Sequence, residues 1–206
     1  MWEEEEGIVE KIRDFIDDFE TYVEVSRVGE IARRYFVMNA FDGALTMLGF
    51  VVGSFLSGLK DPEVVVSGGL GASFAMGVSG FVGALLSEKA EREREIKELE
   101  KILFTKLKGT GSIVERANTI AVILAALIDA LAPALAAIVS AAPFIYAMYF
   151  KISFFTAMTV SITITLTIVF LLGFYLGKIS GENPIKYGLV MVLAGLLISL
   201  VTLFHV

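Results

Sequence analysis

The sequence contains no cysteine and only one histidine, His205. Without cysteine, the chain can form neither disulfide bonds nor thiolate sites such as iron–sulfur clusters. A single histidine cannot build a multi-histidine metal centre. The sequence also has no nucleophile elbow and no phosphate-binding loop. We therefore expect that the chain is not an enzyme and that it holds no covalently bound cofactor.

Charged residues are scarce, at 19% of the chain, whereas 56% of its 206 residues are hydrophobic and the mean hydropathy is +0.75. A soluble domain typically has about 25% charged residues. The apolar residues gather in long blocks, and roughly 20 apolar residues suffice for a helix to cross a bilayer. The sequence therefore predicts an all-α integral membrane protein with five transmembrane helices, at about residues 35–59, 64–87, 117–150, 152–177 and 187–204.

One charged segment precedes the transmembrane domain of residues 35–206, and a second charged segment interrupts it. Residues 1–34 are rich in acidic residues, and apolar spacings of three and four predict an amphipathic cytoplasmic helix at 7–26. The acidic start does not resemble a signal peptide, so we expect the first span to act as an uncleaved insertion signal. Residues 88–108 alternate in charge without proline or glycine, which predicts a cytoplasmic helical extension of the second span.

The distribution of lysine and arginine predicts the orientation in the membrane. Fifteen of the 17 basic residues fall in the N-terminal segment, the loop after the second span and the turn after the fourth. Only Lys60 and Lys151 fall on the other side. Because basic residues stay in the cytoplasm, we expect the N-terminus to be cytoplasmic and the C-terminus to lie on the opposite side. The expected environment is a lipid bilayer, and nucleic acid is not an expected partner.

Two carboxylates interrupt the apolar spans, Asp42 in the first and Asp129 in the third. A charged side chain in the membrane costs a few kcal/mol or more, and no basic residue lies well inside any span to pair with them. Pro133 leaves the carbonyl of Asp129 without its helical donor, and such carbonyls beside carboxylates bind cations. The positive charge that balances these carboxylates is thus predicted to come from a bound cation or a proton. Protonation of Asp129, or a hydrogen bond to a neighbouring helix, is the alternative.

Met76 is the one large residue on a face of small residues in the second span. It is either a gap-filling methionine or a thioether ligand on an ion path. Small residues at helical spacing predict helix packing at Gly49, Gly53, Gly80 and Gly83. Further metal candidates, with a weaker basis, are Met38 and Thr46 on the face of Asp42, and Glu88, Glu91 and Glu95 on the charged helix.

The run Asp42-Gly43-Ala44-Leu45-Thr46, and the run from Ser73 to Phe81 that contains Met76-Gly77, resemble the vacuolar iron transporter family of plants, fungi and parasites and its prokaryotic relatives. The resemblance implies a homodimer that exports Fe²⁺ or Mn²⁺ from the cytoplasm in exchange for protons. It also implies that Asp42 and Met76 line the ion path, and that the chain lies in a prokaryotic plasma membrane.

The chain departs from this family in two places. The family often has Glu-Tyr where this chain has Gly80-Phe81, so one acidic ligand is missing and Asp129 is a candidate replacement. The insertion between the second and third spans has about 29 residues and no methionine, too little for the family's metal-collecting domain. Two other functions stay open: a non-transporting membrane scaffold or subunit, and a proton-coupled transporter of an organic cation.

Overall fold

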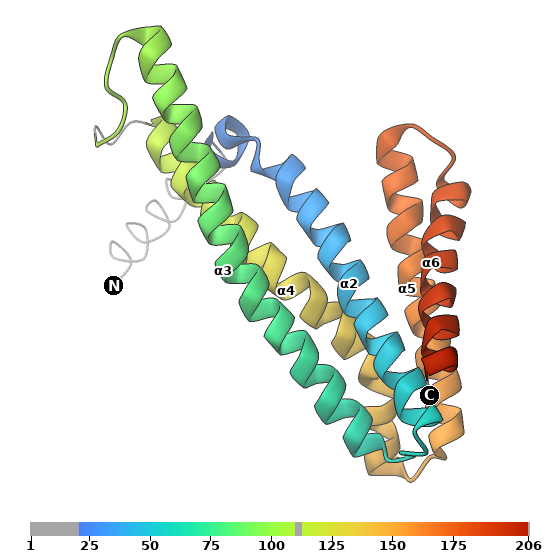
Figure 1. Cartoon of the computed structure of the whole chain (residues 1–206). Coiled ribbons are helices and arrows are strands. Elements are labelled where there is room, and N and C mark those ends of the chain that lie inside the picture. Colours follow the sequence, from blue (N-terminus) through green and yellow to red (C-terminus); the bar gives the residue numbers. More distant parts are fainter. Residues whose placement is uncertain (1–20, 110–112, 206) are drawn as a thin grey trace, which may run out of the picture. The chain divides into compact units, whose positions relative to one another are not determined.

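The computed structural model describes residues 21–109 and 113–205, and all regular structure within these residues is helical (Figure 1). Residues 21–26 are helical, and residues 7–20 of the predicted amphipathic helix lie outside the described part. Five long helices follow: α2 (Val28–Leu56), α3 (Pro62–Leu103), α4 (Ile113–Phe150), α5 (Phe154–Ser180) and α6 (Pro184–His205).

The described residues confirm the predicted all-α fold, and each of the five helices is long and apolar enough to cross a membrane. Their bounds differ from the predicted ones mainly at the charged ends. Helix α2 begins at Val28, seven residues before the predicted span. Helix α3 continues through the charged segment but ends at Leu103 rather than at residue 108, because Phe104 adopts a left-handed conformation (φ 51°) that a helix cannot include.

The described residues form two compact units. The first contains residues 21–34, 81–109 and 113–128, and the second contains residues 35–80 and 129–205. Helices α2, α3 and α4 contribute to both, whereas α5 and α6 belong to the second.

Small side chains allow the helices of the second unit to pack closely. Ala44 and Leu48 of α2 meet Ala132 of α4 and Val169 of α5 in one buried cluster. A second cluster gathers around Met47 of α2, with residues of α3, α4 and α5. Because lipid is as apolar as these side chains, van der Waals packing rather than the hydrophobic effect holds such helices together.

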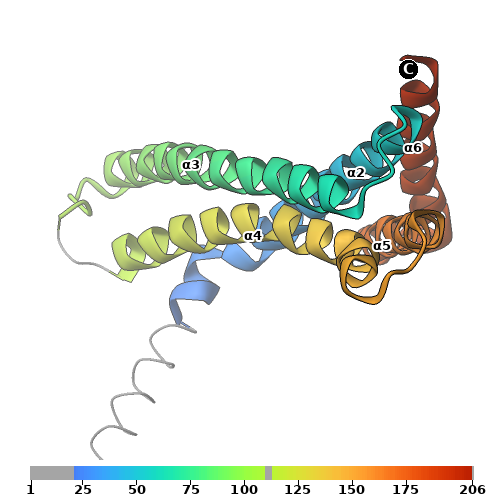
Figure 2. The ribbon, with the colours of Figure 1, turned by 90° about the horizontal axis from the view of Figure 1, so that it is seen from below.

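Helices α5 and α6 form an antiparallel pair in the second unit (Figures 1 and 2). Ser153 caps the start of α5 by accepting the backbone N–H of Thr156, and Gly181 ends it in a left-handed conformation. Gly173 allows the backbones to approach, because a Cβ there would lie 2.6 Å from the carbonyl oxygen of Tyr187. The hairpin therefore depends on glycine at the crossing of its two helices.

In the first unit, carboxylates hold the turn after α3. One oxygen of Glu100 accepts the backbone N–H groups of Leu107 (2.7 Å) and Lys108 (2.9 Å). The carboxylate of Glu115 accepts the N–H of Gly109 at 2.9 Å. The backbone hydrogen bonds from Lys108 and Leu107 hold the pKa of Glu100 below its ordinary value, because they favour the charged carboxylate.

This arrangement predicts that the turn loosens in acid. The pKa of Glu100 is lower in the folded protein than in the unfolded chain. The stabilisation of the turn by the Glu100 carboxylate is therefore complete above the ordinary glutamate pKa of about 4.3, and it is lost as pH falls through the lower folded pKa. Hydrogen exchange of the Leu107 and Lys108 amides, corrected for intrinsic rates, should show protection that falls with pH in this range.

The variant Glu100→Gln should show weaker protection that does not titrate in this range, because the glutamine side chain is uncharged. Glu91→Gln is the matched control, since Glu91 is exposed on the same helix and should leave the profile unchanged. Identical pH profiles for the parent and Glu100→Gln would contradict this account of the turn.

Candidate functional site

The carboxylate of Asp129 is buried in the second unit, where the residue is 7% exposed. The side-chain amide of Asn39 on α2 donates a short hydrogen bond to its Oδ1. The same amide nitrogen donates to the carbonyl of Tyr35 at 2.9 Å. Asn39 therefore fixes the orientation of Asp129 and links α4 to α2.

The other oxygen of Asp129 points to Gly80 on α3. A Cβ at Gly80 would lie 2.5 Å from Oδ2 of Asp129 and 3.3 Å from its backbone carbonyl oxygen. No side chain could be added at position 80 without displacing the carboxylate. Gly80 thus makes room for an acidic side chain from α4.

Pro133 and two glycines shape the backbone around this carboxylate. Pro133 has no N–H, so the carbonyl of Asp129 lacks its regular helical donor. Gly43 of α2 packs directly against the backbone of Pro133, and a Cβ at Gly77 of α3 would lie 2.9 Å from the carbonyl oxygen of Ala130. Both neighbouring helices therefore approach α4 at glycine, which brings oxygen atoms of α4 close to them.

Asp42 lies on α2, three residues after Asn39, and its side chain is exposed on the second unit. Asp42 and Asp129 are near enough for their charges to interact. Among the described residues, no lysine or arginine forms an ion pair with either carboxylate. The two carboxylates singled out in the sequence thus belong to the same unit.

Met76 of α3 contacts the face of α2 that carries Asp42. The hydroxyl of Thr46 donates to the sulfur of Met76 at 3.5 Å, and Thr46 lies one helical turn after Asp42. Met76 is half-buried. A thioether, a hydroxyl and a carboxylate therefore follow one another along the junction of α2 and α3.

Several predicted residues do not join this group. Met38 is exposed one turn before Asp42. Glu88 is buried beside Arg92 in the first unit, whereas Glu91 and Glu95 are exposed. Within the described ranges, no group of three or more His, Cys, Asp or Glu residues could hold a metal ion, so these three glutamates do not form a metal cluster.

Of the predicted packing glycines Gly49, Gly80 and Gly83, Gly80 alone leaves no room for a side chain. A Cβ at Gly49 would make an ordinary contact of 3.7 Å with Ile198, and one at Gly83 would meet no described atom within 4 Å. The carbonyl of Gly53 accepts the N–H of Ser57 at 2.9 Å. Asn39 is the residue that the sequence analysis missed, and its place on the face of Asp42 within an apolar span was the available signal.

Comparison with known proteins gives little beyond this geometry. No family model matches the chain. Over 78 residues it is 44% identical to an uncharacterised protein of Methanocaldococcus jannaschii, an alignment that covers 38% of this chain and 40% of the relative. The matched part of the chain thus spans less than half the length of that relative. The membership in the vacuolar iron transporter family stays a prediction.

The contact between Gly80 and Asp129 can be tested with a double-mutant cycle. Gly80→Ala should destabilise the protein by about 1–3 kcal/mol, because the added methyl group overlaps the carboxylate. In an Asp129→Ala background the same substitution should cost much less. Unfolding of the purified protein in detergent measures both effects, with Gly83→Ala as the control on the same helix. Equal costs of Gly80→Ala in the two backgrounds would contradict the contact.

Proposed function

We propose that this protein exports divalent metal ions, Fe²⁺ or Mn²⁺, from the cytoplasm in exchange for protons. The observation that carries the proposal is the position of the Asp129 carboxylate at Gly80 of α3. The Asp129 carboxylate comes from α4 and lies at Gly80, where vacuolar iron transporters often have a glutamate. Asp42 and Met76, which the same resemblance assigns to the ion path, lie on the two helices that adjoin it.

The chemistry of these side chains fits the proposed ion. Carboxylate and carbonyl oxygens bind hard divalent cations, and a thioether adds a softer ligand that suits Fe²⁺ or Mn²⁺ better than Ca²⁺. A carboxylate can hold either a metal ion or a proton, so release of one on binding of the other couples the two flows. Asn39 would orient Asp129 for the metal, as partners of metal ligands commonly do.

The proposed transporter works as a homodimer. Phe74 and Val78 of α3 are exposed, and so are Gly71, Ala75 and Ser79, which recur at a spacing of four residues. Small residues at this spacing favour close packing of membrane helices. A second copy on this face would add its own carboxylates to a site that has only two per chain.

The proposed orientation places the N-terminus and the charged half of α3 in the cytoplasm and the C-terminus across a prokaryotic plasma membrane. Its basis is the distribution of lysine and arginine. The acidic residues of the N-terminal amphipathic helix and of the cytoplasmic extension would then face the side from which metal enters.

A transporter of an organic cation is the second candidate. It is favoured by one observation: the two carboxylates have no third acidic, histidine or cysteine ligand among the described residues. An ammonium group needs fewer ligands than a metal ion does. Organic cations that compete with Fe²⁺ for transport would support this candidate against the first.

Flux into proteoliposomes tests the proposal. We expect Asp42→Asn and Asp129→Asn each to lower Mn²⁺ transport by at least about tenfold, the effect of losing even an outer-shell partner of a metal site. Met76→Leu should lower Fe²⁺ transport more than Mn²⁺ transport, because the thioether is the softer ligand. A dye for internal pH should report proton movement against the metal in the parent protein and much less of it in Asp42→Asn and Asp129→Asn.

The matched control is Asp61→Asn, because Asp61 lies in the turn before α3 and accepts the backbone N–H of Glu63 at 2.9 Å. Asparagine keeps that acceptor, so transport should be unchanged. The proposal fails if Asp42→Asn and Asp129→Asn transport Fe²⁺ and Mn²⁺ as the parent does.

A further inference from the structure

A cavity of about 410 Å³ lies in the first unit, between the charged half of α3 and the first turns of α4. Its lining includes the apolar side chains of Leu85, Ile96, Val122 and Ile123. It also includes the basic residues Lys89, Arg92 and Lys108 and the acidic residues Glu93 and Glu115. A cavity of this size and composition can hold part of an amphiphilic ligand.

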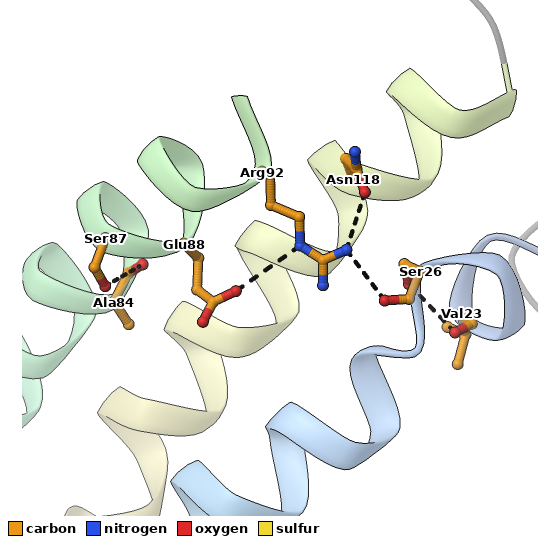
Figure 3. Close-up of polar contacts among 7 residues, drawn as sticks. All are labelled: Val23, Ser26, Ala84, Ser87, Glu88, Arg92 and Asn118. Carbon is orange, nitrogen blue, oxygen red and sulfur yellow. Dashed lines mark hydrogen bonds and ion pairs between the residues drawn. The ribbon is translucent and has the colours of Figure 1, made fainter. Parts of the chain in front are cut away.

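Arg92 is the buried polar group of this cavity, with 7% of the residue exposed. One terminal nitrogen donates to the carbonyl of Ser26 (3.1 Å) and to the side-chain oxygen of Asn118 (2.9 Å), and Nε lies 3.9 Å from Glu88 (Figure 3). The second terminal nitrogen has no acceptor among the described residues. This nitrogen is not among the buried atoms that lack a partner, so it keeps access to solvent and can donate to an anionic oxygen.

The other charges of the lining leave an excess of donors. Lys108 pairs with Glu93 at 3.4 Å, and Glu115 accepts the N–H of Gly109. Lys89 is exposed and joins none of the ion pairs between described residues. The charge of Arg92 is paired with Glu88, so among the described residues the ammonium of Lys89 is the unpaired cation of the lining, and the second terminal nitrogen of Arg92 adds a charged donor. Two such cationic donors favour a phosphate oxygen over a neutral or cationic group.

The position of the cavity along the helices indicates where this phosphate comes from. On α3 the apolar run ends just before Glu88, and on α4 it begins after Arg116. Leu85, Val122 and Ile123 thus lie on the apolar side of this boundary, and Lys89 lies on the charged side. A lipid of the surrounding leaflet has its phosphate and its acyl chains arranged in the same order.

We propose that this cavity binds the phosphate headgroup of a membrane lipid, with Arg92 and Lys89 on the phosphate and an acyl chain along Leu85, Val122 and Ile123. Basic pockets between transmembrane helices commonly bind anionic lipid headgroups. The bound lipid contacts α3 and α4, and through Arg92 it stabilises the turn at Ser26 that precedes α2. This site is independent of the proposed metal transport.

Thermal unfolding of the full chain in detergent, titrated with three probes, tests the site. Phosphatidylglycerol should raise the unfolding temperature in a saturable manner, whereas diacylglycerol without phosphate and inorganic phosphate without a chain should not. Lys89→Gln should weaken phosphatidylglycerol binding about fivefold, as expected for the loss of one basic residue near a lipid phosphate. Lys97→Gln is the control, because Lys97 is exposed on the same helix and does not line the cavity.

A second variant tests the apolar end of the cavity. Thr119→Trp, at an exposed position of the lining, should block lipid binding by filling the cavity without removing a charge. The proposal is overturned if diacylglycerol stabilises as well as phosphatidylglycerol, or if Lys89→Gln and Lys97→Gln bind the lipid equally. Stabilisation by inorganic phosphate equal to that by the lipid would overturn the assignment to a membrane lipid.

Discussion

The cost of placing a carboxylate in a membrane without a basic partner constrains this structure more than any other interaction. Asp129 is buried, and no lysine or arginine lies well inside any of the five spans to neutralise it. An amide from α2 fixes one of its oxygens, and the absence of a side chain at Gly80 of α3 accommodates the other. These contacts orient the carboxylate but supply no positive charge, and an exchangeable cation or proton can supply it.

The helices could be predicted from the sequence because hydropathy and charge vary along the chain in long, uniform blocks. The contacts between helices could not, since they depend on single residues. Gly43 and Gly77 bring α2 and α3 onto α4, yet each looks like any other small residue of a membrane span. Glu88, Glu91 and Glu95 look alike on one charged helix, yet Glu88 is buried beside Arg92 whereas Glu91 and Glu95 are exposed. Asn39 could have been found only from its place on the face of Asp42, three residues away in an apolar span.

The two units apply the same principle to charges of opposite sign. In the second unit, carboxylates without basic partners are oriented by an amide and by glycine, and we propose that a metal ion completes them. In the first unit, Arg92 is buried with one nitrogen unused, and we propose that a lipid phosphate completes it. In each case, protein groups orient a buried charged side chain and leave part of its hydrogen-bonding or ligand capacity to a bound partner of opposite charge.

Anomalous diffraction from crystals of the full chain grown with Mn²⁺ tests the central claim most directly. We predict an anomalous peak in contact with the carboxylates of Asp42 and Asp129 that is lost in crystals of Asp129→Asn. A peak found only at exposed carboxylates such as Glu91 and Glu95, or no peak at concentrations that support transport, would contradict the account.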